Sequence, residues 1–491
     1  MNLAILLVLP VALADTLNAN LTLLQDPDIW WHLADARLFT TTHHFIQTEP
    51  YSFSVAGERW INPEWLSELP YWFSFKAFDL RGLYLVTWLA LGANLLLLYW
   101  RSHLNARNAE AAFWTSCIGF VLMTVNSGPR TIVFGYLAMS AELLILEQAG
   151  RGDRRFLWFL PPLFCLWINL HGSWLIGFAL FALYVLCGVV RLHIGALEQD
   201  AFPAAERNRL LGVLAVSMVA LFVNPYGWRL VWSPIDMMLN QGVNIANVSE
   251  WKPLNLGSLQ GIFAVVVIAL MVLANLKVPR KWRLYDLAVI FFAFYAGVDH
   301  VRFLFLTAVL ITPLLAADVA RSFPAEASGK TIPVMNGIIA AGALCFVAFM
   351  YPSEAKLEKN LALAFPLKII ESIDPAWRTF NWDYVGGRMA FESKPSLIDS
   401  RLDTFEHHGV LQNYLAAMNG VDSLAVLNHY NIDHVLILKN QPLAGVLDHA
   451  PGWSVESREV TSDGLYVLFA KTPATSGSAA SGAQSTAPAS R

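Results

Sequence analysis

Residues 82–100 read GLYLVTWLALGANLLLLYW and contain no charged side chain. A helix needs about 20 mostly apolar residues to cross the hydrocarbon core of a bilayer, so this stretch predicts a membrane span. Further apolar blocks lie near residues 3–24, 111–126, 131–147, 156–170, 173–190, 210–224, 259–276, 284–299, 303–318 and 332–351. We therefore predict an all-α polytopic membrane protein with about eleven transmembrane helices.

The composition of the whole chain supports the membrane class. Of its 491 residues, 56% are hydrophobic and 14% are charged, and the mean hydropathy is +0.47. About a quarter of the residues of a soluble domain are charged. The formal net charge is only -4 and the sequence has no basic tract. The composition thus favours the lipid bilayer as a partner and argues against nucleic acid.

The first apolar block has two interpretations. It carries Asp15, Asn18 and Asn20, which are unusual within a span. It is either a retained first span or a signal peptide cleaved after Ala14, although no Lys or Arg precedes that point.

Lysine and arginine are divided unevenly between the loops, and short cytoplasmic loops usually carry the excess. The cations of one set of loops are Arg101, Arg107, Arg151, Arg154, Arg155, Arg191, Arg207, Arg209, Lys277, Arg280, Lys281, Arg283, Arg321 and Lys330. The short hairpins on the opposite side contain Arg130 and Arg302. This division predicts a cytoplasmic N-terminus, with residues 25–81, residues 224–258 and the C-terminal part outside the cytoplasm.

The composition changes after the last apolar block, which divides the chain into a transmembrane domain (1–351), an extracytoplasmic domain (352–471) and a tail (472–491). The tail is rich in Ser, Ala, Gly and Thr and is predicted to be disordered. In the extracytoplasmic domain, β-like runs occur at residues 396–398, 434–438 and 465–470. Helical patterns separate them, near residues 366–374, 410–418 and 421–429. This alternation predicts a small α/β domain, which we interpret as a lid or an acceptor-docking module.

The first outer loop begins with Asp26-Pro27-Asp28, where the first span leaves the bilayer. Carboxylates at that boundary are partly desolvated, which raises their pKa, and such a group can take a proton from a hydroxyl nucleophile. Two amphipathic helices are expected to lie at the membrane surface beside them; they contain Trp30, Trp31, Leu33 and Phe39, and Trp60, Trp65, Leu66, Leu69, Trp72 and Phe73. These helices would wall a cleft that is open to lipid and to water. Alternatively, the two aspartates simply mark the end of a span.

The order of several short motifs resembles a bacterial branch of the GT-C glycosyltransferase superfamily, the RgtA/B/C/D-like membrane glycosyltransferases. The resemblance covers roughly residues 3–470. It rests on the runs DPDIWWHL (26–33), WINPEWL (60–66), NLHGS (169–173), NPYGW (224–228), SEW (249–251), HVRF (300–303), WDYVGG (382–387) and IDSR (398–401).

This resemblance implies a bacterial inner-membrane enzyme that uses a polyprenyl-phosphate-linked sugar. An acidic residue of the first outer loop would act as the base for the acceptor hydroxyl while the lipid phosphate leaves, usually with inversion. By position, Asp28 is the first choice for this role and Asp26 the second. Relatives often carry an Asp-Glu pair here, whereas this chain has Asp-Pro-Asp, so the choice between the two stays open.

Five further polar residues are candidates for contact with the phosphate or sugar of a donor. Arg130 and Arg302 can hold phosphate oxygens in a bidentate manner, and His300 adjoins Arg302; helix capping or contact with lipid headgroups is the alternative. His171, beside Gly172, could bind phosphate or sugar hydroxyls, or could cap a helix, and the nearby Asn169 is a further candidate contact for the donor.

The remaining candidates lie in the two outer loops. Glu64, one turn from Glu68, is a second acid that would position the acceptor or the base, unless it belongs to a solvated helix face. Glu250 belongs to a loop that either closes over a donor or only connects two spans. His32, His43 and His44 lie near the two aspartates and are interpreted as ordinary polar loop histidines, with ligation of a divalent metal as the alternative; no metal ligand set is assigned. His32 is also a candidate contact for the phosphate or sugar of the donor.

Gly386-Gly387 in the C-terminal domain predicts a turn or, alternatively, an anion site at the start of a helix. The preferred function is transfer of a monosaccharide from a polyprenyl phosphate to a glycan, lipid or protein acceptor. A transporter or flippase of a lipid-linked saccharide is one alternative, although it should carry ionisable residues near the middle of several spans. A non-catalytic subunit that binds a lipid-linked glycan is the other.

Overall fold

The structure is a computed structural model, and it describes residues 24–123, 128–324, 334, 338, 341–342, 345 and 351–472. Most of three predicted segments lies outside these residues: the spans at 3–24 and 332–351 and the tail. The alternative signal peptide lies outside them entirely.

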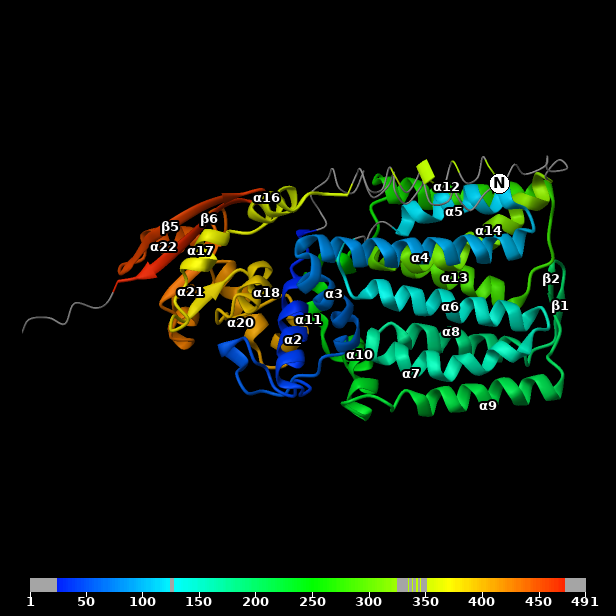
Figure 1. The fold of residues 1–491 in the computed structure, drawn as a ribbon, viewed down its shortest axis with the longest axis horizontal. Helices are drawn as coiled ribbons and strands as arrows, with labels where there is room; N and C mark the ends of the chain where they lie inside the picture. The colour runs from blue at the N-terminus through cyan, green and yellow to red at the C-terminus, as the bar shows by residue number, and fades with distance from the viewer. Residues whose placement is uncertain are drawn as a thin grey trace, which may run out of the picture.

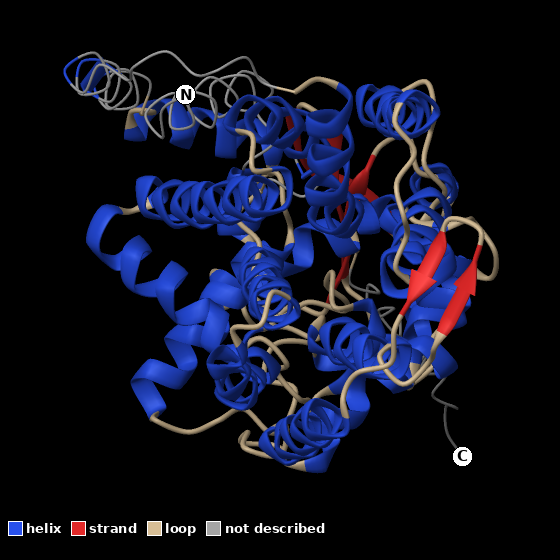
Figure 2. Ribbon diagram, turned by 90° about the vertical axis from the view of Figure 1, so that its right-hand side faces the viewer, coloured by secondary structure: helices blue, strands red, loops and turns tan. Residues whose placement is uncertain are grey.

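Long apolar helices lie side by side along the long axis of the molecule and form a bundle (Figure 1). Figure 2 looks along this bundle and shows most of its helices end-on. The bundle helices are α4 (Leu80–Ala106), α5 (Ala109–Met123), α6 (Ile132–Gly150), α7 (Leu160–Leu170), α8 (Trp174–Cys187), α9 (Ala204–Ala220), α12 (Leu259–Lys277), α13 (Leu284–Asp299) and α14 (Leu304–Ser322).

Four helical segments of the described chain are long and apolar enough to cross a membrane. They are Leu80–Ala106, Ile132–Gly150, Leu259–Lys277 and Val301–Ser322. The predicted spans at 82–100, 131–147, 259–276 and 303–318 fall on these segments, and those at 111–126 and 173–190 fall largely on the shorter apolar helices α5 and α8. The prediction of a mostly helical membrane protein is thereby confirmed, while the total of about eleven spans stays a prediction.

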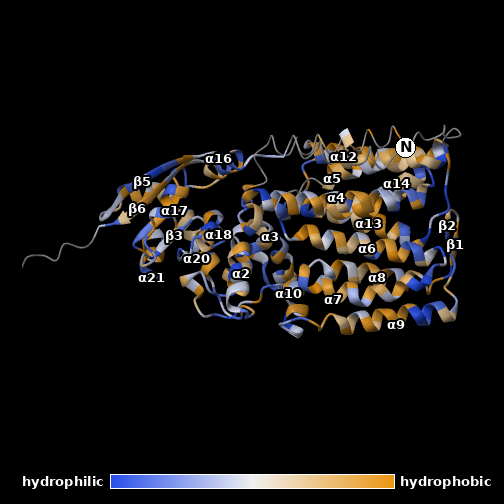
Figure 3. Ribbon diagram, in the orientation of Figure 1, coloured by the Kyte–Doolittle hydropathy of each residue, from blue (hydrophilic) through white to orange (hydrophobic). Residues whose placement is uncertain are grey.

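Hydrophobic residues dominate the middle of the bundle helices, and hydrophilic residues gather toward their ends (Figure 3). Glu142 departs from this pattern, because its side chain is wholly buried within α6. One end of the bundle carries the short hairpin of β1 (Leu192–Ile194) and β2 (Leu197–Gln199) (Figure 1). The other end carries the two predicted outer loops.

The two outer loops lie together between the bundle and the C-terminal part of the chain (Figure 1). The first loop forms α2 (Asp28–Thr42), η2 (Phe53–Val55) and α3 (Trp65–Phe78). The second loop forms α10 (Trp228–Asn240), α11 (Gly242–Asn247) and η5 (Ser249–Trp251). A short turn, η6 (Val301–Phe303), leads from α13 into α14 at the same end.

Helix α2 is not the surface-bound helix that the sequence predicted. All of its residues from Ile29 to Ala36 are buried in protein. Trp30 makes edge-on contacts with Phe365 and Phe391 of the C-terminal part. A tryptophan suits a protein core as well as a membrane surface, so the prediction of an interfacial helix was wrong for α2. Helix α3 exposes Phe73 and Phe78, and its contact with the membrane surface stays a prediction.

The C-terminal residues form a four-stranded sheet with helices around it. Its strands are β3 (Thr379–Asn381), β4 (His434–Leu438), β5 (Trp453–Thr461) and β6 (Gly464–Lys471), in the order β3-β4-β6-β5. β3 and β4 are parallel, and the other two pairs are antiparallel. The helices are α16 (Glu354–Ala364), α17 (Leu367–Ser372), α18 (Asp383–Phe391), α19 (Leu402–Glu406), α20 (Val410–Met418), α21 (Ser423–His429) and α22 (Pro442–His449).

The predicted strands at 434–438 and 465–470 coincide with β4 and lie within β6. The predicted strand at 396–398 is not part of the sheet, because Ser396 makes only an isolated bridge with Ser52 of the first outer loop. The sequence analysis also missed β5, whose exposed and half-buried residues alternate along the edge of the sheet.

Gly386 and Gly387 lie within α18, so neither a turn nor an anion site at a helix start is correct. A Cβ atom on Gly387 would lie 2.5 Å from the backbone oxygen of Pro27, and one on Gly386 would lie 2.2 Å from that of Ile398. Gly387 therefore allows α18 to approach the start of α2 closely, which brings the C-terminal part near Asp28, whereas Gly386 allows α18 to pack against Ile398.

Candidate active site between the first outer loop and the bundle

Asp26 has both carboxylate oxygens engaged. One oxygen accepts a hydrogen bond of 3.0 Å from the backbone N–H of Asp28, and the other pairs with the guanidinium of Arg130. The side chain is buried. These contacts give Asp26 a structural role, because it orients the entry into α2 and neutralises Arg130.

Arg130 joins the two outer loops. It precedes α6 in a short hairpin, and its guanidinium pairs with Asp26 on one side and with Glu250 of the second loop on the other. The sequence predicted Arg130 and Glu250 as donor contacts without linking them. Because two carboxylates neutralise the guanidinium, Arg130 should attract a phosphate less strongly than the sequence suggested.

Asp28 occupies the first turn of α2, where the helix dipole favours a negative charge. Its half-buried carboxylate receives a hydrogen bond of 3.4 Å from the indole N–H of Trp31. Burial, reinforced by the neighbouring charge of Asp26, raises the pKa of Asp28 to about 7, although Arg130 opposes this shift. A carboxyl group with such a pKa can accept a proton near neutral pH.

Glu64 faces the same site from the residue that precedes α3. Its carboxylate accepts a hydrogen bond from the hydroxyl of Thr131 and lies 3.2 Å from Nε2 of His171 and 3.4 Å from Nε2 of His32. Burial raises the pKa of Glu64 to about 7, and the charge of Asp28 adds to the effect. Glu64 is thus enclosed by polar partners and is not part of a solvated helix face.

His171 ends α7 and is held as a neutral ring. Its Nδ1 accepts the backbone N–H of Ser173 at 2.9 Å, so Nε2 carries the proton and points to Glu64. Burial lowers the pKa of His171 to about 3, and Arg302 and Arg130 add to this shift. His171 therefore ends its helix and also faces Glu64, so the helix-capping role does not conflict with the predicted contact to a phosphate or sugar.

Asn169 has a packing role in the structure. Its amide oxygen accepts the indole N–H of Trp65 at 2.9 Å, and its amide nitrogen donates to the backbone oxygens of Cys165 and Val223. These bonds fix the end of α7 against α3. Direct contact between Asn169 and a donor stays a prediction.

The three histidines proposed as metal ligands do not gather. His32 is buried between Glu64 and Glu68, whereas His43 and His44 are exposed at the far end of α2, about 17 Å from His32 along the helix axis. Within the residues that the structure describes, no group of three or more His, Cys, Asp or Glu side chains has the arrangement of a metal site.

Arg302 and His300 border the site through the second outer loop. The guanidinium of Arg302 lies 4.3 Å from the ring centre of Trp251, a cation–π contact, and Nδ1 of His300 donates to the backbone oxygen of Trp251 at 2.6 Å. The charge of Arg302 acts to lower the pKa of Glu64, against the effect of burial, and adds to the lowering of the pKa of His171.

The sequence analysis missed a buried polar network behind α2. Asp28, His32 and Asp35 follow one face of the helix at the spacing i, i+4, i+7, and this pattern was the available signal. Asp35 accepts hydrogen bonds from Tyr51 at 2.7 Å and from Asn62 at 3.2 Å.

Arg401 closes this network from the C-terminal part. It pairs with Asp399 and with Glu49, and its guanidinium lies over the ring of Trp60. The preceding residue, Ser400, lies close enough to Asp28 for its hydroxyl to favour the ionised carboxylate. Residues Ile398–Arg401 therefore border the site. The sequence did not predict this, because these residues lie more than 300 positions after the first outer loop.

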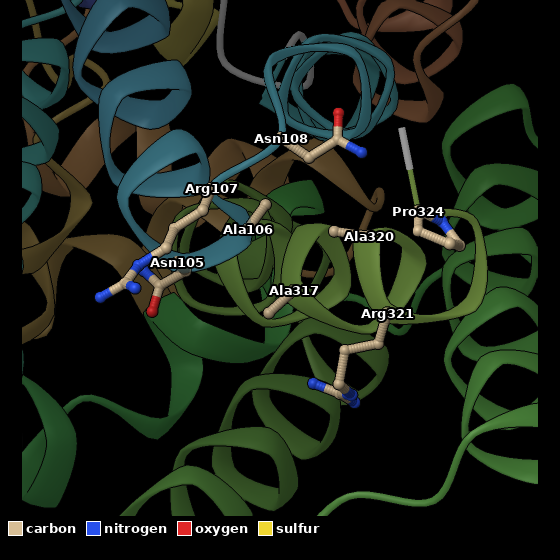
Figure 4. A pocket seen from close by; sticks show the side chains of 8 residues that line it. All are labelled: Asn105, Ala106, Arg107, Asn108, Ala317, Ala320, Arg321 and Pro324. Carbon is tan, nitrogen blue, oxygen red and sulfur yellow. The ribbon is translucent and has the colours of Figure 1, made fainter. Parts of the chain in front are cut away.

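A groove of about 440 Å³ lies at the other end of the bundle, between α4, α5 and α14 (Figure 4). Its lining includes Asn105, Asn108, Arg107 and Arg321. Because α4 begins beside the outer loops and ends at this groove, the groove is separate from the carboxylate site.

Solved structures share this arrangement of the chain. An oligosaccharyltransferase from Archaeoglobus fulgidus, tethered with an acceptor peptide, has 12% identity and a TM-score of 0.51; the match covers 87% of this chain and 68% of that chain. ArnT from Cupriavidus metallidurans, bound to undecaprenyl phosphate, has 14% identity and a TM-score of 0.50; the match covers 94% of this chain and 98% of that one.

The archaeal oligosaccharyltransferase AglB from Archaeoglobus fulgidus, in complex with an inhibitory peptide and a dolichol-phosphate, has 11% identity and a TM-score of 0.50, with coverage of 87% and 68%. The chain shares the overall fold of these solved structures. No family model and no curated protein matches the sequence. The contacts of Arg130 with Asp26 and of Thr131 with Glu64 join the first outer loop to the residues that precede α6.

Proposed function

We propose that this chain is a GT-C membrane glycosyltransferase. It would move a monosaccharide from a polyprenyl-phosphate donor to a glycan, lipid or protein acceptor. The reaction would take place at the extracytoplasmic face of a bacterial inner membrane. The observation that carries the proposal is the contrast between two aspartates. Both carboxylate oxygens of Asp26 are bound, one by Arg130 and one by the backbone N–H of Asp28. The carboxylate of Asp28 can still accept further hydrogen bonds, and its pKa is raised to about 7.

The proposed reaction assigns the base to Asp28. Asp28 takes the proton of the acceptor hydroxyl, and the acceptor oxygen forms a bond to the anomeric carbon. The bond between that carbon and the phosphate oxygen breaks on the opposite side, so that the polyprenyl phosphate leaves and the configuration inverts. Charged groups that the fold already holds in place would stabilise this transition state, because these groups need not reorganise during the reaction.

Arg302 is the proposed principal partner of the leaving phosphate, and His300 supports it through Trp251. The stacking of Arg302 on Trp251 fixes the plane of the guanidinium, which suits bidentate binding of phosphate oxygens. Arg130 would contribute less, because Asp26 and Glu250 already neutralise it. Glu250 would exchange this contact when a donor enters, which supports a closing role for the second outer loop.

The test uses the full-length protein in lipid vesicles with polyprenyl-phosphate-linked monosaccharides and a set of acceptors. A transferase releases polyprenyl phosphate and produces a glycosylated acceptor, and Asp28→Asn should abolish both. A non-catalytic subunit would bind the donor without cleaving it. A transporter would move an intact donor to the opposite leaflet, and either result would contradict the proposed function.

A further inference from the structure

Helix α10 has a row of large apolar side chains that the described part of the chain leaves exposed. Figure 1 shows the helix at the end of the bundle that carries the outer loops. Because an α-helix has 3.6 residues per turn, residues 228, 232, 235 and 239 lie along one side. The strongly exposed residues on or beside this side, called here the apolar side of α10, are Trp228 (62%), Trp232 (46%), Met238 (66%) and Leu239 (69%).

A second side of α10 is polar and lies in water. It is formed by the residues that follow the apolar positions by one, which are Arg229, Ser233, Asp236 and Asn240. The carboxylate of Asp236 lies 2.8 Å from Nε2 of His407 and accepts a hydrogen bond of 2.8 Å from the amide of Asn240. His407 and Asn240 are both exposed, so this pair of contacts is open to solvent.

The third side of α10 packs against the bundle. Leu230 is buried, and a Cβ atom on Gly172, just before α8, would lie 3.9 Å from Cβ of Pro234. The apolar side and the polar side therefore both stay exposed. Water alone does not suit the uncovered apolar side, and hydrocarbon alone does not suit the ion pair of Asp236. The boundary between water and lipid suits both sides.

The run NPYGW (224–228) forms a fixed corner between α9 and α10. The amide nitrogen of Asn224 donates to the backbone oxygens of Leu221 at 2.8 Å and Gly227 at 3.0 Å, and its Oδ1 accepts the backbone N–H of Tyr226 at 2.8 Å. Gly227 has a φ of 59°, a backbone conformation that favours glycine. The corner ends the predicted span at 210–224 and starts α10 at the next residue.

The exposed apolar surface of α9 continues across this corner onto α10. Val219 is exposed in the last turn of α9, and Phe222 and Val223 are exposed directly after it. In a membrane-spanning bundle, such a surface faces lipid. Tryptophan, present twice on the apolar side of α10, is enriched where lipid meets water. The continuity of the two surfaces therefore points to lipid as the occupant of both.

We propose that α10 lies in the surface layer of the membrane, with its apolar side against the lipid acyl chains and Asp236 in water. The two charged residues of α10, Arg229 and Asp236, have opposite signs, so the contact should not depend on the charge of the headgroups. From α10 the chain leads through α11 to Glu250, which pairs with Arg130. The membrane surface thereby fixes the second outer loop beside the candidate site, and this inference does not rest on the proposed function.

Fluorescence quenching of the full-length protein in phospholipid vesicles tests the contact. The fluorophore NBD is attached to the new cysteine of Leu239→Cys or of the matched control Asn240→Cys, two exposed neighbours on the apolar and polar sides. The signal of the labelled parent, whose four native cysteines stay in place, is subtracted. Phospholipids with a nitroxide high on the acyl chain quench a label in lipid, and iodide quenches a label in water.

The nitroxide lipid should quench the label at position 239 about threefold or more strongly than the label at position 240, because an interfacial helix buries its apolar side by about 5–10 Å. Iodide should give the reverse order, and added phosphatidylglycerol should change neither result. Equal quenching of both labels by iodide would place the apolar side in water. A label at position 239 that neither quencher reaches would show that protein, such as a second copy of the chain, covers it. Either result would overturn the proposal.

A measurement without labels guards against misfolding of the cysteine variants. Brominated phospholipids quench tryptophan in lipid, so the quenchable part of the fluorescence should fall in Trp232→Phe. It should stay unchanged in the control Trp453→Phe, which alters β5 of the C-terminal part. Both variants should show the helical circular dichroism of the parent. An unchanged quenchable part in Trp232→Phe would contradict the lipid contact.

Discussion

The guanidinium of Arg130 binds the carboxylate of Asp26, and this pair separates the functions of two aspartates that are only two residues apart. Asp26 is held by these structural contacts, and Asp28 is the residue that we propose for the chemistry. The same guanidinium holds Glu250, so the first and second outer loops share one charged centre.

Exchange of each aspartate for asparagine should separate these functions. Asp28→Asn should lower turnover by about a thousandfold or more while the donor still binds, because the base is lost. Asp26→Asn leaves Arg130 without its buried partner and should destabilise the fold by about 2 kcal/mol. Donor cleavage and thermal unfolding measure the two effects, with the exposed Asp374→Asn as the control. Equal loss of activity without loss of stability in both variants would refute the division.

The activity should depend on pH through Asp28 and Glu64, whose pKa values are raised to about 7. Both must be ionised to accept or orient a proton, so kcat/KM should fall as the pH decreases below about 7. A profile of kcat/KM against pH between about 5 and 9 checks this. An acid limb that remained near pH 4 would show that neither group controls the rate.

Stability should show the opposite sign at Asp28. Its folded pKa lies above the ordinary value of 3.8, so the folded state retains the proton longer and loses stability as the pH rises from about 4 to about 7. Asp28→Asn removes this cost. The variant should therefore unfold at a higher temperature than the parent at pH 7, and this advantage should vanish near pH 4. Calorimetry at the two pH values tests the difference.

Arg302→Ala should chiefly weaken binding of the polyprenyl-phosphate donor. Loss of a bidentate phosphate contact should raise the Kd for a polyprenyl phosphate by about tenfold or more, with Arg302→Lys between the two. Arg229→Ala is a suitable control, because that guanidinium also lies near a tryptophan ring, that of Trp228. Equal binding by the parent and Arg302→Ala would remove Arg302 as a phosphate contact.

Two glycine variants test the contact between α18 and α2. Gly387→Ala would bring a Cβ atom within 2.5 Å of the backbone oxygen of Pro27, and should destabilise the protein by about 1–3 kcal/mol and impair turnover, because α18 must shift. Gly445→Ala in α22 has open space around the new Cβ and should be neutral or slightly stabilising. The same thermal unfolding in both variants would show that the approach of α18 is unimportant.

The apolar pattern was sufficient to predict the bundle, because a span must satisfy its own backbone hydrogen bonds and present apolar side chains to lipid. Helix α2 shows where such reasoning ends. Trp30 and Trp31 look like residues of a membrane surface, but the aromatic partners of Trp30 lie more than 300 residues later in the chain. Periodicity within one segment does not reveal what covers it.

The sequence predicted only part of the candidate site, because it does not reveal which distant segments lie in contact. Asp26, Asp28 and Arg130 were identified from their positions near predicted span ends, and Glu64 from its place in the first outer loop; the structure brings them together. Our proposal of Asp28 over Asp26 rests on the contact between Asp26 and Arg130, which the sequence could not reveal. Glu68 and His32 were visible as residues, but their pairing joins α2 to α3 and depends on how those helices pack.

The burial of α2 has a consequence for dividing this protein into pieces. Ile29, Trp30 and Leu33 share one hydrophobic core with Val385 and Leu468 of the C-terminal sheet region. A fragment that started at Tyr351 would expose this apolar surface to water and should aggregate. A truncated bundle would lose the cover of the helix that carries Asp28. The protein should therefore be produced and assayed as a whole chain, and swapping C-terminal parts between relatives should succeed only when α2 is exchanged with them.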